Sequence, residues 1–154
     1  MLDLPVGDAA KLAARIAARE VRAVDVVRAQ LARLHAVHES TNCIAWCDPD
    51  AALARAVALD AAVAPVGPLH GVPFTVKDWI DVEGLPCTGG WRASADRIAP
   101  SHATAVARML DAGGVLLAKT TVLVESEVYG PVRNPHDPAC SPGASSPGSS
   151  TASA

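Results

Sequence analysis

The stretch T-A-V-A-R-M-L-D-A-G-G-V-L-L-A-K-T at residues 104–120 predicts three structural elements in succession. Apolar residues recur at helical spacing over residues 104–110 and indicate a helix there. Gly113 and Gly114 follow, at the point where the end of a helix favours a left-handed residue, and residues 115–118 form a short apolar run that is typical of a buried strand. A second run of this kind precedes the helix, at residues 69–77. Strands that alternate with helices predict an α/β fold, and continuously apolar strands predict a sheet that is covered on both faces.

The N-terminal part of the chain is mainly helical by pattern. Helical spacing of apolar residues recurs over residues 8–20 and 25–37, and residues 42–46 predict a short strand. Asp48 and Pro49 then supply an N-cap and a proline at the first helical position, for a helix that ends near residue 63. We therefore expect residues 1–154 to be the N-terminal part of a single domain. They divide into a mainly helical lead-in at 1–66, a strand-helix-strand segment at 67–129, and a Gly/Ser/Pro-rich loop at 130–154.

The composition excludes several classes of protein. Half of the 154 residues are hydrophobic, as in a globular domain, and the net charge of −3 with scattered arginines gives no reason to bind nucleic acid or an anionic membrane. No apolar stretch reaches the roughly 18 residues of a membrane span, and the N-terminal residues show no signal-peptide pattern, so we expect a cytoplasmic protein. The four cysteines are expected to be reduced thiols, and neither they nor the five histidines show the spacing of metal ligands.

Lys77 is the most distinctive titratable residue. It ends the apolar run V-P-F-T-V at residues 72–76 and is one of three lysines in the chain. Such neighbours would desolvate its ammonium group and favour the neutral amine that a general base needs. Asp78 projects to the opposite face if the strand continues, and so need not cancel this effect. A solvated lysine at a strand end is the alternative interpretation.

Two other motifs have both a structural and a chemical interpretation. Residues 139–154 read A-C-S-P-G-A-S-S-P-G-S-S-T-A-S-A and carry no charge, which is typical of a flexible linker but also supplies hydroxyl groups for a lysine base. Residues 113–120, G-G-V-L-L-A-K-T, nearly match a phosphate-binding loop. Because a phosphate loop must turn its N–H groups toward the anion, the β-forming residues at 115–117 instead indicate a strand that ends in a structural lysine, Lys119.

Several motifs together resemble one family. They are L-H-G-V-P-F-T-V-K-D at residues 69–78, G-L-P-C-T-G-G at 84–90, A-T-A-V-A-R-M-L-D-A-G-G-V-L-L-A-K-T at 103–120, and G-P-V-R-N-P-H-D-P and P-G-A-S-S within 130–146. In this order they closely resemble the N-terminal part of the amidase signature family, and a fainter similarity of helix pattern reaches back to Asp25.

The resemblance implies an α/β fold with a mixed sheet covered by helices, and hydrolysis of carboxamide C–N bonds. By match of motif, Lys77 takes the place of the family's lysine base and Ser145 that of a serine in a cis peptide linkage. The resemblance implies that Lys77 accepts a proton from Ser145, that Ser145 accepts one from a nucleophilic serine, and that water hydrolyses the resulting acyl-enzyme. We expect a small-molecule amide as the substrate and no cofactor, metal, nucleic acid or membrane partner. The sequence leaves open which amide is the substrate and whether the protein forms a homo-oligomer.

The sequence departs from the family pattern G-G-S-S-G-G at Ala144 and Pro147. A non-prolyl cis peptide costs about 2.5–4 kcal/mol, and a Cβ at Ala144 would add to this steric cost, whereas Pro147 removes an N–H from the loop. The family's nucleophile lies in a later motif, D-x-G-G-S, which residues 1–154 do not contain. We therefore expect an incomplete amidase fold that is inactive by itself. The alternative is a non-catalytic remnant or interaction module with a disordered Ser-rich tail.

Overall fold

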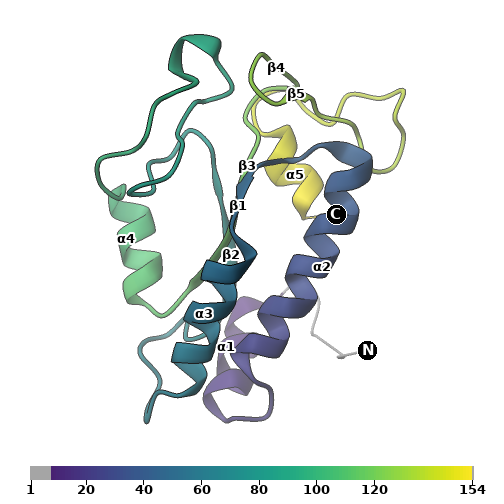
Figure 1. Ribbon diagram of the computed structural model, residues 1–154. Coiled ribbons are helices and arrows are strands. Elements are labelled where there is room, and N and C mark those ends of the chain that lie inside the picture. Colours follow the sequence, from purple (N-terminus) through teal and green to yellow (C-terminus); the bar gives the residue numbers. More distant parts are fainter. Residues whose placement is uncertain (1–7, 154) are drawn as a thin grey trace. The chain divides into compact units, whose positions relative to one another are not determined.

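The structure is a computed structural model that describes residues 8–153 (Figure 1). The expectation that the chain starts without a signal peptide falls on residues 1–7, outside the described residues. The described helices are α1 (Ala9–Ala17), α2 (Ala23–Thr41), α3 (Pro49–Asp60), α4 (Thr104–Asp111) and α5 (Pro147–Ala152), with a 3-10 helix at Arg92–Ser94. The described strands are β1 (Ile44–Cys47), β2 (Pro73–Lys77), β3 (Val115–Thr120), β4 (Glu125–Ser126) and β5 (Gly130–Pro131).

Two compact units make up the described chain, and each is built from separate segments. The first unit consists of residues 8–32, 48–74 and 107–117, and the second of residues 33–47, 75–106 and 118–153. The residues expected to carry chemistry, Lys77 and Ser145, both belong to the second unit.

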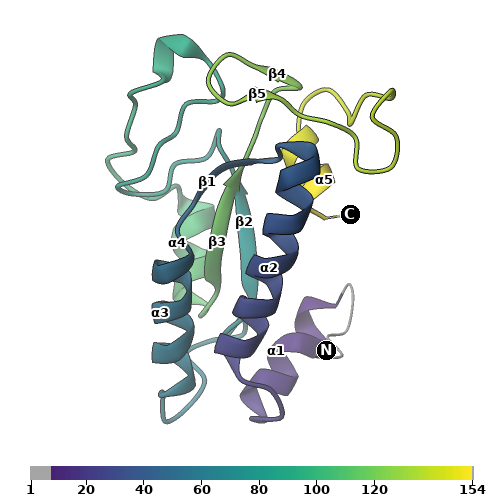
Figure 2. The ribbon, with the colours of Figure 1, turned by 45° about the vertical axis from the view of Figure 1, so that its right-hand side comes forward.

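The main sheet has three strands in the order β1-β3-β2, side by side in Figure 2. The Val115 N–H donates to the Val72 carbonyl, and the Asp78 N–H donates to the Thr120 carbonyl, each at 2.9 Å. Because both hydrogen bonds advance in the same direction along the two strands, β2 and β3 run parallel, whereas β1 is antiparallel to β3. The sheet is therefore mixed, and the central strand β3 is almost entirely buried, as its apolar sequence predicts.

The starts of α1 and α3 confirm the sequence pattern. The side chain of Asp8 accepts a hydrogen bond from Lys11 N–H, and that of Asp48 accepts one from Ala51 N–H, each at 3.0 Å. Pro49 lies in the first turn of α3, where its missing N–H costs nothing. These local caps explain why both helices begin where the sequence alone places them.

The first unit is held together by polar side chains that satisfy helix and strand ends. The Asp60 carboxylate accepts the N–H groups of Ala23 at 2.7 Å and Val24 at 3.0 Å, and so caps the start of α2. Arg55 donates to the carbonyls of Leu110 at 2.5 Å and Gly114 at 2.7 Å. A carbonyl in the last turn of α4 and one just after the helix thereby receive donors before the chain enters β3.

In the second unit, Asn42 links the end of α2 to the segment that follows β3. Asn42 takes a left-handed conformation with φ of 57°, as expected for the residue that ends a helix. Its side-chain amide donates to the carbonyls of Tyr129 at 2.7 Å and Pro131 at 3.1 Å. The strands β4 and β5, which pair antiparallel through Glu125–Pro131 and Ser126–Gly130, are anchored in this way.

The C-terminal segment differs from its sequence interpretation. Residues 130–154 were expected to form a loop, but residues 147–152 form α5, in which Pro147, Gly148 and Thr151 are buried. The expectation of a continuous loop, and the alternative of a disordered Ser-rich tail, are wrong for these six residues. Their order comes from contacts with the end of β3, which no local pattern reveals.

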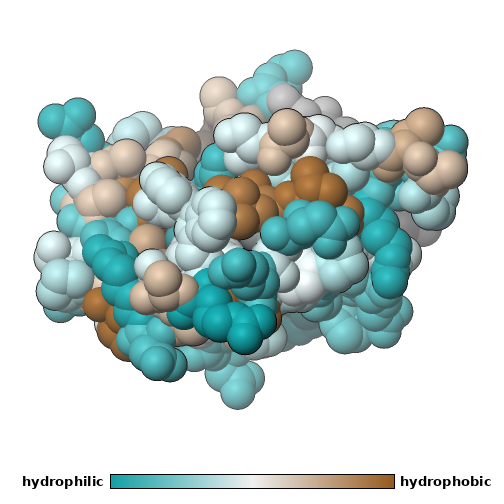
Figure 3. All heavy atoms as spheres, turned by 90° about the horizontal axis from the view of Figure 1, so that it is seen from above, coloured by the Kyte–Doolittle hydropathy of each residue, from teal (hydrophilic) through white to brown (hydrophobic). Residues whose placement is uncertain are grey.

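No helix within residues 8–153 is both long and apolar enough to cross a membrane. Figure 3, which looks along the vertical axis of Figure 1, shows hydrophobic residues in small patches that hydrophilic residues separate.

Candidate active site

Lys77 and the serine pair come together in the second unit. The Nζ of Lys77, at the end of β2, donates to the Ser146 Oγ at 2.8 Å and to the Ser145 carbonyl oxygen at 2.5 Å. Lys77 is half-buried, Ser146 is half-buried and Ser145 is exposed. The structure thus brings the predicted base to the predicted serine motif, although 68 positions separate Lys77 from Ser145 in the sequence.

The helix α5 fixes the position of Ser146. Ser146 is the residue before the helix, and its carbonyl accepts the Ser150 N–H at 3.1 Å. Its hydroxyl makes no capping hydrogen bond, so it is free to accept from Lys77. Pro147 occupies the first turn, where a helix needs no N–H, so this departure from the family pattern is compatible with the loop.

The end of β3 supplies the surface on which α5 rests. The Ser149 and Thr120 hydroxyls lie 2.9 Å apart. A Cβ at Gly148 would come within 2.5 Å of the Thr121 nitrogen and 2.6 Å of its carbonyl oxygen. Only glycine permits this close approach of the helix to the strand end, and the approach places Ser146 beside Lys77.

Two details of the serine loop differ from the expectation. No peptide bond in the described residues is cis, so the bond before Ser145 is trans, and the hydroxyl that Lys77 contacts is that of Ser146. A non-prolyl cis bond costs about 2.5–4 kcal/mol and persists only where the surroundings hold it, whereas Ser145 is exposed. Ala144 is not among the residues with positive φ, and it is exposed, so its Cβ meets no backbone restriction in this conformation.

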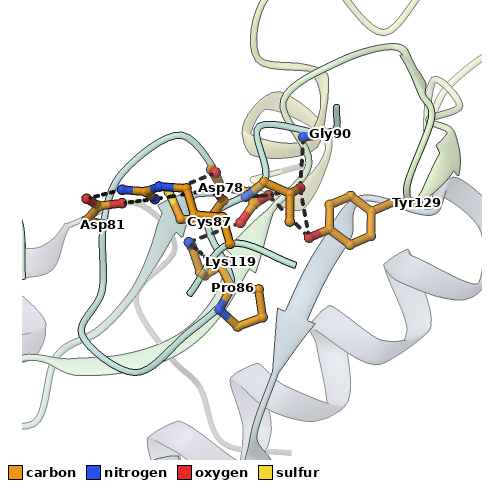
Figure 4. A network of polar contacts seen from close by, with 9 residues as sticks. Asp78, Asp81, Pro86, Cys87, Gly90, Lys119 and Tyr129 are labelled. Carbon is orange, nitrogen blue, oxygen red and sulfur yellow. Dashed lines mark hydrogen bonds and ion pairs between the residues drawn. The ribbon is translucent and has the colours of Figure 1, made fainter. Parts of the chain in front are cut away.

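Asp78 belongs to a buried polar network (Figure 4), whereas the Lys77 amine contacts the serine pair. The Asp78 Oδ1 lies 3.0 Å from the Nζ of Lys119, and both side chains are fully buried. Figure 4 shows the Lys119 amine between Asp78 and the Pro86 carbonyl, to which it also donates. From the sequence we expected Asp78 on the face opposite Lys77 if the strand continued, and a structural role for Lys119, but not that Asp78 and Lys119 pair. The sequence did contain a signal for this pair, because Asp78 follows one apolar strand and the oppositely charged Lys119 lies near the end of the other.

The motif P-C-T-G at residues 86–89 wraps around this ion pair. The Thr88 N–H and hydroxyl donate to the Asp78 Oδ2 at 3.1 and 2.7 Å, and the Tyr129 hydroxyl donates to the same oxygen at 3.2 Å. The Asp78 carbonyl accepts from the Gly89 N–H at 3.2 Å and from the Cys87 thiol at 3.4 Å. Burial raises the pKa of the Tyr129 phenol, so it keeps the proton that it donates. Thr88 and Tyr129 were not among the predicted site residues, because nothing in their local sequence pattern marks them.

A cleft of about 450 Å³ lies beside this network, since Cys87, Thr88 and Gly89 line it as well. The exposed rings of Trp79 and Trp91 contribute to its wall.

The same cleft is lined by an ion pair between Asp81 and Arg97. The Arg97 guanidinium donates to both Asp81 oxygens at 2.5 and 2.8 Å, and these bonds hold the pKa of that carboxyl well below its usual range. Asp81 is therefore a permanent anion at neutral pH and has no role as an acid.

Three histidines accept backbone hydrogen bonds through Nδ1 and so have structural roles. His38 accepts from the Ile44 N–H at 3.1 Å, His70 from the Val66 N–H at 3.0 Å, and His102 from the Glu83 N–H at 3.0 Å. Within residues 8–153, no group of three His, Cys, Asp or Glu side chains is arranged to hold a metal ion.

Comparison with known proteins identifies the family and the fold of this chain. The family model described as Amidase matches residues 25–154. The chain belongs to this amidase family, which is the amidase signature family that its motifs resemble.

Two relatives from bacteria illustrate the similarity. The chain is 42% identical to a glutamyl-tRNA(Gln) amidotransferase subunit from Acidothermus cellulolyticus over 162 residues, which covers 99% of this chain and 32% of the relative. It is 37% identical to the acylamidase of Rhodococcus erythropolis, with 94% of this chain and 32% of the relative covered. The chain thus spans about a third of the length of the curated relatives it matches.

Solved structures share the fold. A fatty acid amide hydrolase superposes with a TM-score of 0.87 at 28% identity, over 93% of this chain and 27% of that one. The peptide amidase of Stenotrophomonas maltophilia gives a TM-score of 0.83 at 31% identity, over 94% of this chain and 33% of that one. The fold of this chain is therefore an α/β segment of the amidase signature fold.

Proposed function

We propose that residues 1–154 supply the base and the proton relay of an enzyme that hydrolyses carboxamide C–N bonds. The observation that carries this proposal is the contact of the Lys77 Nζ with the Ser146 Oγ at 2.8 Å and with the Ser145 carbonyl at 2.5 Å. A lysine that approaches a serine hydroxyl to hydrogen-bond distance has the geometry of a general base.

The proposed chemistry is a Ser-cisSer-Lys relay. Lys77, as the neutral amine, takes a proton from the serine pair, and the pair takes one from a nucleophilic serine that attacks the amide carbonyl. The tetrahedral intermediate that forms expels the amine, which takes the relayed proton back from the serine pair. Water then hydrolyses the acyl-enzyme that remains. Ser145 is the relay by family motif, and Ser146 presents the hydroxyl that Lys77 contacts in this structure. The nucleophile belongs to a D-x-G-G-S segment, which is not part of residues 1–154.

The names of the relatives support the substrate class. They include an acylamidase, a peptide amidase and a fatty acid amide hydrolase, which share an amide bond and differ in the groups attached to it. We propose a small-molecule amide as the substrate and expect residues 1–154 alone to show no turnover.

The test is a chimera in which residues 1–154 replace the corresponding third of the Rhodococcus acylamidase, so that the rest of that enzyme supplies the segments that residues 1–154 lack. We expect the chimera to hydrolyse simple aliphatic or aromatic amides and Lys77→Met to lower kcat by roughly 10²–10⁴-fold. Lys11→Met is the matched control, because Lys11 is an exposed lysine far from the serine motif in the sequence. Ser145→Ala and Ser146→Ala, measured side by side, identify the relaying hydroxyl.

Two results would contradict the proposal. One is a folded chimera whose turnover is unaffected by Lys77→Met. The other is measurable amide turnover by residues 1–154 alone that disappears in Lys77→Ala, which would show that the nucleophile lies within these residues.

A further inference from the structure

We propose that Lys119 and Asp78 are positioning residues for Lys77: Lys119 neutralises the Asp78 carboxylate inside the fold and so leaves Lys77 available to the serine pair. The importance of Lys77 in this inference rests on the proposed function, but the ion pair and its effect on Lys77 can be measured without any amide turnover.

Lys77 and Lys119 have different partners. Lys77 and Asp78 are neighbours in sequence and lie where β2 ends, while Lys119 lies near the end of the parallel strand β3. Among the described residues, the ion pair of Asp78 is formed with Lys119 at 3.0 Å. The Lys77 amine instead contacts Ser145 and Ser146. A carboxylate next to the expected base is thus paired with the other lysine.

The ion pair between Asp78 and Lys119 is fully buried. The Asp78 and Lys119 side chains are both 0% exposed, and a buried charge is tolerated only when it is paired and hydrogen-bonded. The two Asp78 oxygens differ in their partners. Oδ2 accepts from Thr88 and Tyr129, whereas Oδ1 has no hydrogen-bond partner and contacts the Lys119 amine. Neutralisation of this carboxylate therefore depends on Lys119.

Removal of the Lys119 amine would change the electrostatic surroundings of Lys77. Asp78 would then hold an uncompensated negative charge, and the neighbouring cation on the chain is Lys77. That charge would favour the ammonium form of Lys77 and compete with the serines for it. Two unit charges roughly 10 Å apart change a protonation equilibrium by about twofold in bulk water and by about sixteenfold at an effective dielectric constant of about 20, so about fivefold is an intermediate value.

The pair also holds the loop around it. Lys119 donates to the Pro86 carbonyl, and Asp78 accepts from Thr88 and Gly89. The ends of β2 and β3 and the motif at residues 86–89 are thereby joined through two charged groups. This explains why a polar segment without regular secondary structure is almost entirely buried at residues 87–90.

The test measures the reactivity of the Lys77 amine in the 154-residue chain. The three lysines are labelled with an amine-acylating reagent at mildly alkaline pH, and the label at each site is quantified by mass spectrometry. Lys11 is exposed and serves as the internal reference in every variant. The variants are Lys119→Met, Lys119→Arg, Asp78→Asn and the double variant Asp78→Asn/Lys119→Met, each checked for folding by circular dichroism.

We expect Lys119→Met to slow the labelling of Lys77 about fivefold relative to Lys11, because the ammonium form does not react. Lys119→Arg keeps the cation and should label as the unaltered chain does. The double variant removes both charges and should return Lys77 to within about twofold of its original rate. If Lys119→Met and Asp78→Asn unfold and the double variant folds with normal Lys77 labelling, the proposal is equally supported, because charge balance is then what the fold requires.

Opposite results would overturn the inference. One is a folded Lys119→Met in which Lys77 labels normally. Another is a double variant that fails to fold or that labels as Lys119→Met does, since the side chains would then matter for shape rather than for charge. Neither result bears on whether Lys77 is a catalytic base, so failure here is distinguishable from failure of the proposed function.

Discussion

Replacement of Gly148 by alanine should separate α5 from the strand end on which it rests. The added Cβ would lie 2.5 Å from the Thr121 nitrogen and 2.6 Å from its oxygen, and both are backbone atoms that cannot rotate away. An ordinary contact needs roughly 3.4 Å, so the helix must move by about 0.9 Å. This movement would stretch the contact between the Ser149 and Thr120 hydroxyls, which is 2.9 Å long.

The free energies can be estimated from the two opposing effects. Alanine in place of glycine stabilises a helix interior by about 1 kcal/mol, and less in the first turn. Overpacking against a fixed backbone costs about 1–3 kcal/mol. We therefore expect Gly148→Ala to destabilise the attachment of α5 by about 1–2 kcal/mol. Because α5 has only six residues, it will detach locally before the whole chain unfolds.

The assay is hydrogen exchange of the α5 amides, together with urea unfolding of the whole chain. Ser150→Ala is the matched control, because Ser150 is an exposed residue of the same helix and its substitution adds helix propensity without a clash. We expect faster exchange in Gly148→Ala and unchanged or slower exchange in Ser150→Ala. Equal protection in the two variants would refute the reasoning that close approach to Thr121 fixes this helix.

Three further predictions concern stability. Lys119→Met should lower the free energy of unfolding by about 3–5 kcal/mol, because it leaves the buried Asp78 charge unpaired. The double variant Asp78→Asn/Lys119→Met should lower it less, and urea unfolding measures both variants. Thr88→Val should cost about 1.5–3 kcal/mol, since it removes a donor to a buried carboxylate, whereas Thr75→Val at an exposed strand position should change little in the same assay. Burial lowers the pKa of His38 below its usual 6.5, so the unfolded state binds more protons and stability should fall as the pH drops below about 6.5. His38→Gln should reduce that slope in urea unfolding measured across this pH range, and an identical slope would contradict the assignment.

Much of the fold follows from local sequence signals. The cap at Asp48 with Pro49, the glycine at position 113 and the apolar runs of β2 and β3 predict where α3 begins, where the chain turns after α4 and which strands are buried. Such signals act within one turn or a few residues, so they can be read without knowing the rest of the structure. They fail for α5, whose Ser, Pro and Gly residues have no helical periodicity and are ordered by contacts with β3.

The candidate site divides in the same way. The sequence by itself determined that Lys77 ends an apolar strand and that a serine pair follows in a family motif. Only the tertiary structure decided that Lys77 reaches the Ser146 hydroxyl across 69 positions and that Lys119, not Lys77, neutralises Asp78. The reason is physical: which charges and hydroxyls meet depends on the parallel pairing of β2 with β3 and on the close approach of Gly148 to Thr121, and both are set by packing between segments that are distant in the sequence.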